Sequence, residues 1–490
     1  IGTVRAISLE NYTIDIKKTE RSVDIHPTAV HVSEVVRPGS LETSLMDLAT
    51  AIDEYGLGHT WPYPASKDLL MKRHPRMKEG VVGAYSLPGE DGVASAIRFA
   101  VNLDRSYLAI QGPPGSGKTY TGANMITALA KLGKKIGITA VSHKVIRNLA
   151  KATIKSAKEQ NFSIRFVHKV SEVGNEAADG ISEVNKSDKA LDGLKEGKVV
   201  CGTAWLWAED NSREALDYLF VDEAGQMSLS QVLAASRAAQ NLILLGDPQQ
   251  LEQPQKGSHP EGSDVAALTY LLEGHPTMPE GRGLFLGVTR RLHPDICRFT
   301  SEIFYEGKLT SLPGLEKQII TGITLFAGAG LFYVPVHHRG NQNKSLEEME
   351  TVISIVGNLL AEGRWTNVKG ETQLLRKEDI LIVAPFNAQV SALRERLPGI
   401  EIGTVDKFQG QEAPVVIYSM TSSTPEDAPR GMNFLYSPNR LNVATSRAKC
   451  ICILVASPLL MEPECRTIDQ MRWANALCRY KEMARVVENF

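Results

Sequence analysis

The feature that most constrains this chain is a glycine-rich loop between an apolar strand and a helix. In LAIQGPPGSGKTYTGANM, residues 108–125, a glycine is followed by four residues and then by glycine, lysine and threonine. Glycines at this spacing let backbone N–H groups turn toward a phosphate, and the lysine adds a positive charge beside them. The context fits, because a strand is predicted to end at Ile110 and a helix to begin at about Thr119. We therefore predict a nucleotide-binding loop, with a chance glycine turn as the alternative.

The residues of this loop have separate expected roles. Lys118 is expected to place its charge beside the β and γ phosphate oxygens, and the Thr119 hydroxyl to ligate Mg²⁺. The loop residues predicted to bind the nucleotide are Gly112, Pro113, Pro114, Gly115, Ser116, Gly117, Lys118 and Thr119.

Apolar runs on both sides of the loop predict an α/β fold with parallel sheets. Runs such as KIGITAV, YLFV and NLILLG are short and uninterrupted, which is typical of strands that helices bury on both faces. A second series, from LFYVPV to CICILVA, alternates with helical stretches but contains no second phosphate loop. We therefore predict two tandem parallel-sheet domains, residues 81–286 and 287–490, that share one nucleotide. The more charged residues 156–198 are expected to form a helical surface excursion.

The front of the chain has a different period. Between residues 3 and 34 apolar and polar residues alternate, which predicts short strands in a small antiparallel sheet or barrel. Residues 40–56 have a helical pattern, and a linker rich in proline and glycine is expected from 61 to 92.

The composition is that of an ordinary globular protein. It is 43% hydrophobic and 22% charged, and no apolar run reaches the ~18 residues that a membrane span requires. We expect a cytoplasmic protein without membrane contact. The net charge of −2 neither requires nor excludes nucleic acid, because a basic groove can lie on a neutral protein. Since the chain begins with Ile1, we expect a longer protein whose front half is not included.

The six cysteines predict packing and not a disulfide or metal framework. Cys450 and Cys452 lie two residues apart in an apolar strand, so both are expected on one face of it. A zinc or iron–sulfur site would normally need a second close pair of ligands.

Two adjacent carboxylates end a predicted strand in YLFVDEAGQMSL. Asp222 is expected to hold Mg²⁺ through its water shell, and Glu223 to take a proton from the attacking water. Adjacent acids at a strand end are often only a solvated turn. In combination with the phosphate loop they predict a hydrolase site.

Other candidates are weaker on their own. Gln250, after the strand LILLG, is placed to contact a γ-phosphate or the attacking water. Arginines in TRRLHPDI and RLNVATSRAK suit a phosphoryl group whose charge grows, although a surface helix pair explains them equally well. Trp205, Trp207 and Phe386 are candidates for base stacking, with burial in the core as the alternative.

Six segments in this order resemble the motifs of superfamily 1 helicases. They are GPPGSGKT, VDEAGQ, GDPQQL, RRLHPDI, TVDKFQGQE and RLNVATSRAK, matching motifs I to VI over residues 107–455. The chain looks most like the class that moves 5′ to 3′, which includes the RNA helicase of nonsense-mediated decay and the nuclease-helicase of Okazaki-fragment processing. It also resembles the helicase half of bacterial fusion proteins whose front half is a RecB-like nuclease.

The resemblance implies two RecA-like domains, preceded in residues 1–80 by a small β-barrel, a helical stalk and a linker. It also implies roles for single residues. Arg291 and Arg447 match the arginines that reach across the interdomain cleft to the γ-phosphate, Gln250 matches the motif III glutamine, and Glu412 matches the motif V acid near the ribose. The family's strand-binding positions fall on Ser142, Thr203, Asn387 and Thr404.

Two departures concern the nucleotide base. The upstream glutamine that contacts adenine in many relatives has no counterpart here. Arg290 stands where relatives often have an aromatic residue, and it is expected to stack on the base by a cation–π contact. This pattern leaves the use of other triphosphates open.

We therefore predict an ATP-dependent helicase or translocase that uses Mg²⁺ and moves 5′ to 3′ on single strands. DNA is the favoured strand and RNA the other candidate. We expect a monomer, with a nuclease domain outside this chain as a further partner. Two alternatives are a P-loop ATPase that remodels a protein client, and a nucleic-acid-binding ATPase with little unwinding. The predicted catalytic residues are Lys118, Glu223, Gln250, Arg291 and Arg447.

Overall fold

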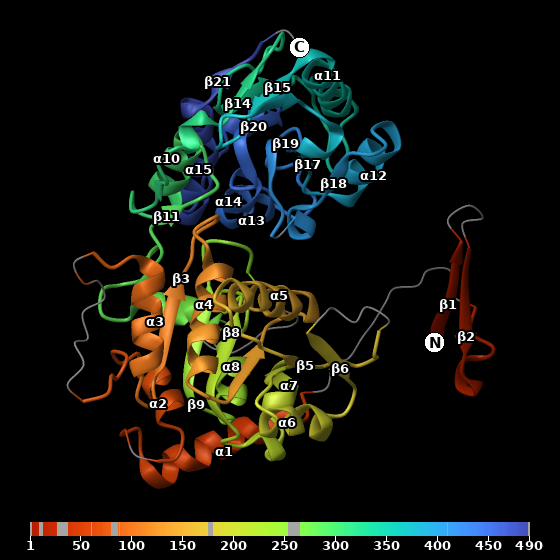
Figure 1. Ribbon diagram of the computed structural model, residues 1–490. Coiled ribbons are helices and arrows are strands. Elements are labelled where there is room, and N and C mark those ends of the chain that lie inside the picture. Colours follow the sequence, from red (N-terminus) through yellow and green to blue (C-terminus); the bar gives the residue numbers. More distant parts are fainter. Residues whose placement is uncertain are drawn as a thin grey trace. The chain divides into compact units, whose positions relative to one another are not determined.

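The computed structural model of the chain describes residues 2–8, 13–26, 38–59, 61–79, 87, 89–174, 180–252, 265–408 and 410–488 (Figure 1). The chain divides into two compact units, Ile1–Gly39 and Ser40–Phe490. The two large parallel sheets both belong to the second unit. In the described ranges no helix is long and apolar enough to cross a membrane.

The first sheet has eight parallel strands in the order β10-β3-β9-β8-β4-β7-β5-β6. Its strands are β3 (Tyr107–Gln111), β4 (Ile136–Thr139), β5 (Phe166–Lys169), β6 (Ile181–Val184), β7 (Val199–Cys201), β8 (Leu216–Asp222), β9 (Ala239–Gly246) and β10 (Gly283–Phe285). The apolar runs predicted as strands at β3, β4, β8 and β9 are therefore confirmed.

Helices cover both faces of this sheet because its strand residues are apolar on both sides. On one face lie α3 (Gly92–Asn102), α4 (Lys118–Lys131) and α5 (His143–Glu159), side by side in Figure 1. On the other face lie α1 (Ser40–Tyr55), α2 (Pro64–Leu70), α6 (Ser187–Lys195), α7 (Ala204–Trp207), α8 (Leu229–Ser236) and α9 (Ala267–Leu272). Successive side chains of β3 therefore point to opposite faces of the sheet, with Ala109 in the core on one face and Ile110 in the core on the other.

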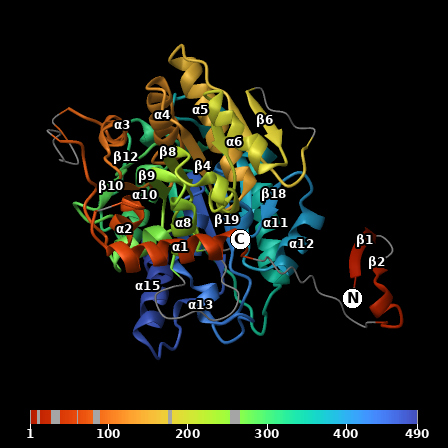
Figure 2. The same ribbon diagram turned by 90° about the horizontal axis from the view of Figure 1, so that it is seen from below.

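Two expectations about irregular segments are wrong. Residues 156–198 are not a surface excursion, since β5 and β6 extend the sheet beyond β7. Each has only four residues, and β6, at the edge of the sheet, buries only Ile181 fully, so they lack the long apolar runs of the central strands. The expected linker from 61 to 92 contains α2, whose side chains are buried beneath α8. Figure 2 shows α2 beside α1 and α8.

The second sheet has six parallel strands in the order β18-β17-β19-β20-β14-β21. These are β14 (Gly330–Pro335), β17 (Ile380–Val383), β18 (Glu401–Gly403), β19 (Ala413–Ser419), β20 (Ala448–Ala456) and β21 (Arg485–Val486). One face packs on α10 (Pro294–Phe304), α13 (Met432–Leu435), α14 (Pro438–Thr445) and α15 (Ile468–Met483), and the other on α11 (Leu346–Glu362) and α12 (Asn387–Arg396). The predicted second parallel sheet is confirmed.

Two smaller sheets accompany it. Strands β11 (Val288–Thr289) and β12 (Thr310–Ser311) are parallel, while β13 (Ile319–Thr321), β15 (Arg364–Thr366) and β16 (Thr372–Leu374) are antiparallel.

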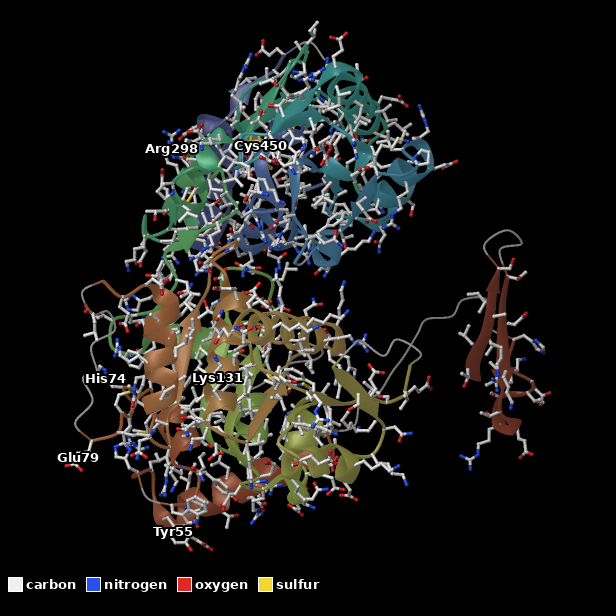
Figure 3. The ribbon with its side chains drawn as sticks, viewed as in Figure 1. Tyr55, His74, Glu79, Lys131, Arg298 and Cys450 are labelled. Atoms are coloured by element: carbon white, nitrogen blue, oxygen red, sulfur yellow. The ribbon has the colours of Figure 1, made fainter. Side chains whose placement is uncertain are left out.

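The expectation that Cys450 and Cys452 share a face of their strand is wrong. Cys450, labelled in Figure 3, lies in the core toward α11, whereas Cys452 lies in the core toward α15. The register between β19 and β20 shifts between the pairs at Ala413 and Val415, and such an irregularity breaks strict alternation. Both thiols are buried and free, and burial raises the pKa of each to about 12, so they pack as small apolar groups.

The first unit contains an antiparallel pair of strands, β1 (Gly2–Ser8) and β2 (Thr13–Lys18), as the alternation predicted. The barrel stays a prediction, because residues 27–37 lie outside the described ranges. The predicted helix at 40–56 is confirmed as α1, which packs Leu48 and Ala51 against the first sheet's helices. The domain boundaries at 80 and 286 also stay predictions.

Candidate active site

Five predicted positions follow neighbouring strands of the first sheet at their carboxyl ends. The phosphate loop follows β3, Gln250 follows β9 and Asp222 ends β8, while Ser142 follows β4 and Thr203 follows β7. In the sheet these strands stand in the order β3-β9-β8-β4-β7. Since all are parallel, the positions line one edge, where open α/β sheets bind ligands. Predicted nucleotide positions occupy three adjacent strands and predicted strand-binding positions the next two.

The phosphate loop is held open by glycines in the left-handed region. Gly115 has φ 73° and Gly117 has φ 84°, and Lys118 begins α4 directly after them. A segment just before α10 braces the outside of the loop. There the Thr289 hydroxyl donates to the Pro114 carbonyl at 2.9 Å and the Arg290 N–H donates to the Gly115 carbonyl at 2.8 Å.

Lys118 and the two adjacent carboxylates form one cluster. The Lys118 ammonium donates to Glu223 Oε2 at 2.8 Å, and the Glu223 N–H donates to Asp222 Oδ1 at 2.9 Å. Burial opposes the charge on Lys118, but Glu223 and Asp222 outweigh it and raise the lysine pKa. Burial raises the pKa of Asp222 to about 6. A cation bound beside Asp222 would keep this carboxylate ionised.

Glu223 itself has φ 55°, a backbone conformation that costs free energy for a residue with a side chain. Such strain concentrates at functional sites, where it aims a side chain in a fixed direction. Here it accompanies the turn from β8 that places the carboxylate beside the phosphate loop.

Gln250 connects the two sheets through hydrogen bonds. Its Nε2 donates to Asp247 Oδ2 at 3.0 Å, and its Oε1 accepts from Arg447 Nη2 at 3.2 Å. Asp247 also accepts from the Tyr305 hydroxyl at 2.6 Å, and Asn442 Nδ2 donates to that hydroxyl at 3.0 Å. Asp247 and Tyr305 were not among the predicted residues. A signal for Asp247 was present, because it follows the apolar strand directly, but nothing in the sequence marked Tyr305.

Arg447 is a buried cation that forms no ion pair with a described carboxylate, although Glu223 and Glu412 are near enough to attract its charge. Its side chain donates to the carbonyls of Val443 and Gln411 and to Gln250, all of them neutral. It is 2% exposed, and burial, together with the nearby charge of Arg291, lowers its pKa to about 9. At neutral pH it is still charged, so the site contains a desolvated positive charge that favours an anion.

Arg291 and Glu412 are paired with each other. Arg291 Nε donates to Glu412 Oε2 at 2.5 Å, and Lys449 lies 2.9 Å from Glu412 Oε1. Burial would raise the pKa of Glu412, but Arg291 and Lys449 more than compensate and lower it. The acid predicted to approach the ribose therefore holds the arginine predicted to approach the γ-phosphate.

These groups surround one cavity of about 400 Å³. Both sheets contribute to its walls. The lining residues are Gly112, Pro113, Pro114, Gly115, Gly117, Lys118, Thr119, Tyr120, Glu223, Gln250, Arg290, Arg291, Gly410, Glu412 and Arg447. Of the predicted nucleotide and metal positions, Ser116 and Asp222 are not in this lining, and Asp222 lies directly behind Glu223.

In the second sheet, the predicted strand-binding positions and the predicted nucleotide positions lie at opposite ends of the strands. Asn387 begins α12 after β17, and Thr404 follows β18, so both stand at carboxyl ends. Glu412 and Arg447 instead precede β19 and β20 at amino ends. The chain between Thr404 and Glu412 thus runs from the carboxyl-terminal ends of the strands to their amino-terminal ends.

The three aromatic residues considered for base stacking differ in how deeply they are buried. Trp207 is completely buried, and its Nε1 donates to the carbonyls of Ile138 and Gly202, so it is a core residue and not a base-stacking one. Trp205 packs partly against the same core. Phe386 is largely buried but precedes Asn387 directly.

Comparisons with known proteins agree with this geometry. Two family models described as AAA domain match residues 90–262 and 269–458. The chain is 23% identical to the ATP-dependent helicase NAM7 of Saccharomyces cerevisiae, over 98% of this chain and 53% of that protein. It is 26% identical to the DNA replication ATP-dependent helicase/nuclease dna2 of Schizosaccharomyces pombe, over 72% and 26% of the two chains. It is also 26% identical to a regulator of nonsense transcripts 1 homolog of Drosophila melanogaster, over 86% and 38%. The chain thus spans about half the length of these relatives or less.

The brace on the phosphate loop can be tested at Gly115. A Cβ atom there would lie 2.5 Å from both Thr289 Oγ1 and Arg291 Cβ. We expect Gly115→Ala to displace the loop at a cost of about 1–3 kcal/mol, which corresponds to a roughly 5- to 150-fold loss of nucleotide affinity. Titration with a fluorescent ATP analogue measures it.

Gly133 provides a matched control for this variant. It has φ 71°, close to that of Gly115, but a Cβ atom there meets nothing within 4 Å. Gly133→Ala should therefore keep normal nucleotide affinity. Equal losses in the two variants would indicate general destabilisation of the fold, and not the contact with Thr289 and Arg291, as the cause.

Proposed function

Since the chain belongs to the superfamily 1 helicases, in the group of the nonsense-mediated-decay helicase, we propose that it hydrolyses ATP to move along and unwind nucleic acid. DNA is the favoured strand and the direction is 5′ to 3′. The expected nuclease partner, the monomeric state and the cytoplasmic location stay predictions.

The observation that supports this proposal most is the buried charge of Arg447. It comes from the second sheet, has only neutral partners among the described residues, and bonds to Gln250 of the first sheet. A triphosphate in the cavity would supply the missing anion, and a bidentate guanidinium stabilises the charge that develops during phosphoryl transfer. Arg447 would then act only when both sheets enclose the nucleotide.

The first sheet offers the groups for hydrolysis. Lys118 forms an ion pair with Glu223. A bound triphosphate would replace Glu223 as the partner of Lys118. A Glu223 oxygen would then be free to accept a proton from water. The Thr119 hydroxyl and the Asp222 carboxylate are the hard oxygen ligands that Mg²⁺ prefers. When bound there, Mg²⁺ would neutralise charge on the β and γ phosphates.

Movement would follow from the loss of the γ-phosphate. With phosphate bound, Arg447 and Lys118 are attracted to the same group from two sheets, and after its release that attraction ends. The strand positions Ser142 and Thr203 belong to one sheet, and Asn387 and Thr404 to the other. A strand held at both places would be gripped alternately as the sheets approach and separate.

The proposed activity is tested by unwinding of partial duplexes. We expect ATP- and Mg²⁺-dependent separation of a duplex with a 5′ single-stranded tail and little separation with a 3′ tail. DNA and RNA versions identify the substrate. ATPase stimulated by a protein client but by no polynucleotide would reject the proposal, and stimulation without strand separation would indicate a translocase.

Glu223→Gln tests the proton acceptor. Because the amide cannot accept the proton, we expect hydrolysis to fall roughly 10²- to 10⁴-fold with nucleotide affinity retained. Glu214→Gln is the control, because Glu214 also has positive φ, 54°, but precedes β8 at the opposite edge. Steady-state phosphate release measures both variants. Near-normal turnover of Glu223→Gln would assign the proton to another group.

Arg447→Ala tests the contribution from the second sheet. Removing one stabilising donor is expected to slow hydrolysis roughly 10²- to 10³-fold with little change in affinity for single strands. Arg479→Ala, which removes a solvent-exposed arginine paired with Glu302, should change neither quantity. Loss of strand binding with unchanged hydrolysis would place Arg447 in the strand interface instead.

A further inference from the structure

An aromatic and arginine cluster lies near the predicted strand positions of the second sheet. The rings of Phe386 and Phe434 are 5.7 Å apart, and Phe386 immediately precedes Asn387. The guanidinium groups of Arg430 and Arg440 both lie over the Phe434 ring, at 3.9 and 4.2 Å from its centroid. The sequence named Phe386 as a candidate for base stacking, and Arg440 begins the segment RLNVATSRAK, but nothing in it marked Phe434 or Arg430.

The two arginines on this ring differ in their charge partners. Arg440 forms an ion pair with Asp406 at 3.1 Å, and its side chain is only 16% exposed. Arg430 is exposed and makes no ion pair with any described carboxylate. Arg440 is therefore neutralised within the fold, while Arg430 keeps a free positive charge at the surface.

The Phe434 ring also restricts the side chain of Arg430, whose guanidinium carbon lies 3.9 Å from the ring centroid. A guanidinium stacked on an aromatic face keeps its N–H groups in one plane, directed outward from the edge of the stack. Such a group loses less side-chain entropy on binding a phosphate than a free lysine or arginine does. The contact with Phe434 thus lowers the entropy cost when Arg430 binds an anion from solution.

The cluster lies close in sequence to both residues of the second sheet that are predicted to bind the nucleic-acid strand. Phe386 connects it to Asn387 through the chain, and Asp406 stands two residues after Thr404. Strand order places β18, β17 and β19 next to one another, and the cluster is built from segments that follow them. A polynucleotide that contacts Asn387 and Thr404 would pass within reach of this surface.

We propose that Arg430, supported by Phe434, binds a backbone phosphate of the single strand beside Asn387 and Thr404. This inference rests on the proposed function, because it assumes that a polynucleotide occupies those positions. It adds to the grip a contact that none of the six motifs contains. The contact is electrostatic, so it is independent of base sequence and weakens with salt.

Arg430→Ala tests this contact by binding of a fluorescein-labelled oligothymidylate at several salt concentrations. Removing one phosphate contact should reduce the slope of log K against log salt by about 0.7, which means roughly fivefold weaker binding at 0.1 M salt. ATP hydrolysis in the absence of nucleic acid should not change. Arg430→Lys keeps the charge but loses the planar stack, so it should fall between the wild type and Arg430→Ala.

Arg298→Ala is the matched control. Arg298 is also exposed, and Figure 3 labels it on α10, which packs beside β14 and β20. Its removal should leave both affinity and salt slope unchanged. If Arg430→Ala binds like the wild type, or if the two variants weaken binding equally, the assignment of Arg430 is overturned. If the wild type itself binds no single strand, the proposed function fails first.

Discussion

The chemistry of this molecule depends on one buried cation, the guanidinium of Arg447. Removing a charge from water is costly unless hydrogen bonds and an opposite charge replace the water. The fold provides the hydrogen bonds, from Val443, Gln411 and Gln250, but no described carboxylate bonds to the guanidinium, and Glu223 and Glu412 attract it without contact. The protein therefore keeps an electrostatic demand that a phosphate can meet. Because Arg447 also donates a hydrogen bond to Gln250, which follows β9, its position depends on residues of both sheets.

Two ion pairs near the cavity suggest how nucleotide binding is balanced. Lys118 is paired with Glu223, and Arg291 with Glu412, so these two predicted phosphate-binding cations, unlike Arg447, are each paired with a carboxylate that has its own predicted role. A bound triphosphate would replace these carboxylates as the partner of Lys118 and Arg291. For Lys118 and Arg291 the free-energy cost of desolvation is thus already met by the fold, so their contribution to binding would be the difference between a carboxylate and a phosphate partner.

The central strands and the phosphate loop could be predicted from sequence because local patterns determine them. Strands buried on both faces, such as β9 and β20, must be continuously apolar, and a loop that holds phosphate needs glycines at Gly115 and Gly117. Edge strands lack this signal. β6, at the edge of the sheet, and its neighbour β5 have only four residues each and both contain charged residues, so their sequence resembled surface helices.

Other features depend on contacts between distant residues. The faces of Cys450 and Cys452 depend on a register shift opposite β19, which no alternation rule contains. Tyr305 joins the site only because α10 ends beside Asp247, and the pairing of Arg291 with Glu412 joins residues 121 positions apart. Motifs gave the positions of the predicted catalytic residues, but not their partners. The sequence also gave no signal for the stack of Arg430 on Phe434.

The short helix α14 provides a physical route between the two predicted binding regions. Arg440, paired with Asp406, lies near its start, and Arg447 stands two residues after its last residue, Thr445. An eight-residue helix is about 12 Å long, and its own hydrogen bonds make it move as a unit. A displacement of Arg447 when the phosphate leaves would therefore also displace Arg440 and the Phe434 stack on which Arg430 rests. Coupling of this kind needs no chain of many residues, because one rigid element contacts both sites and each site favours one of its positions.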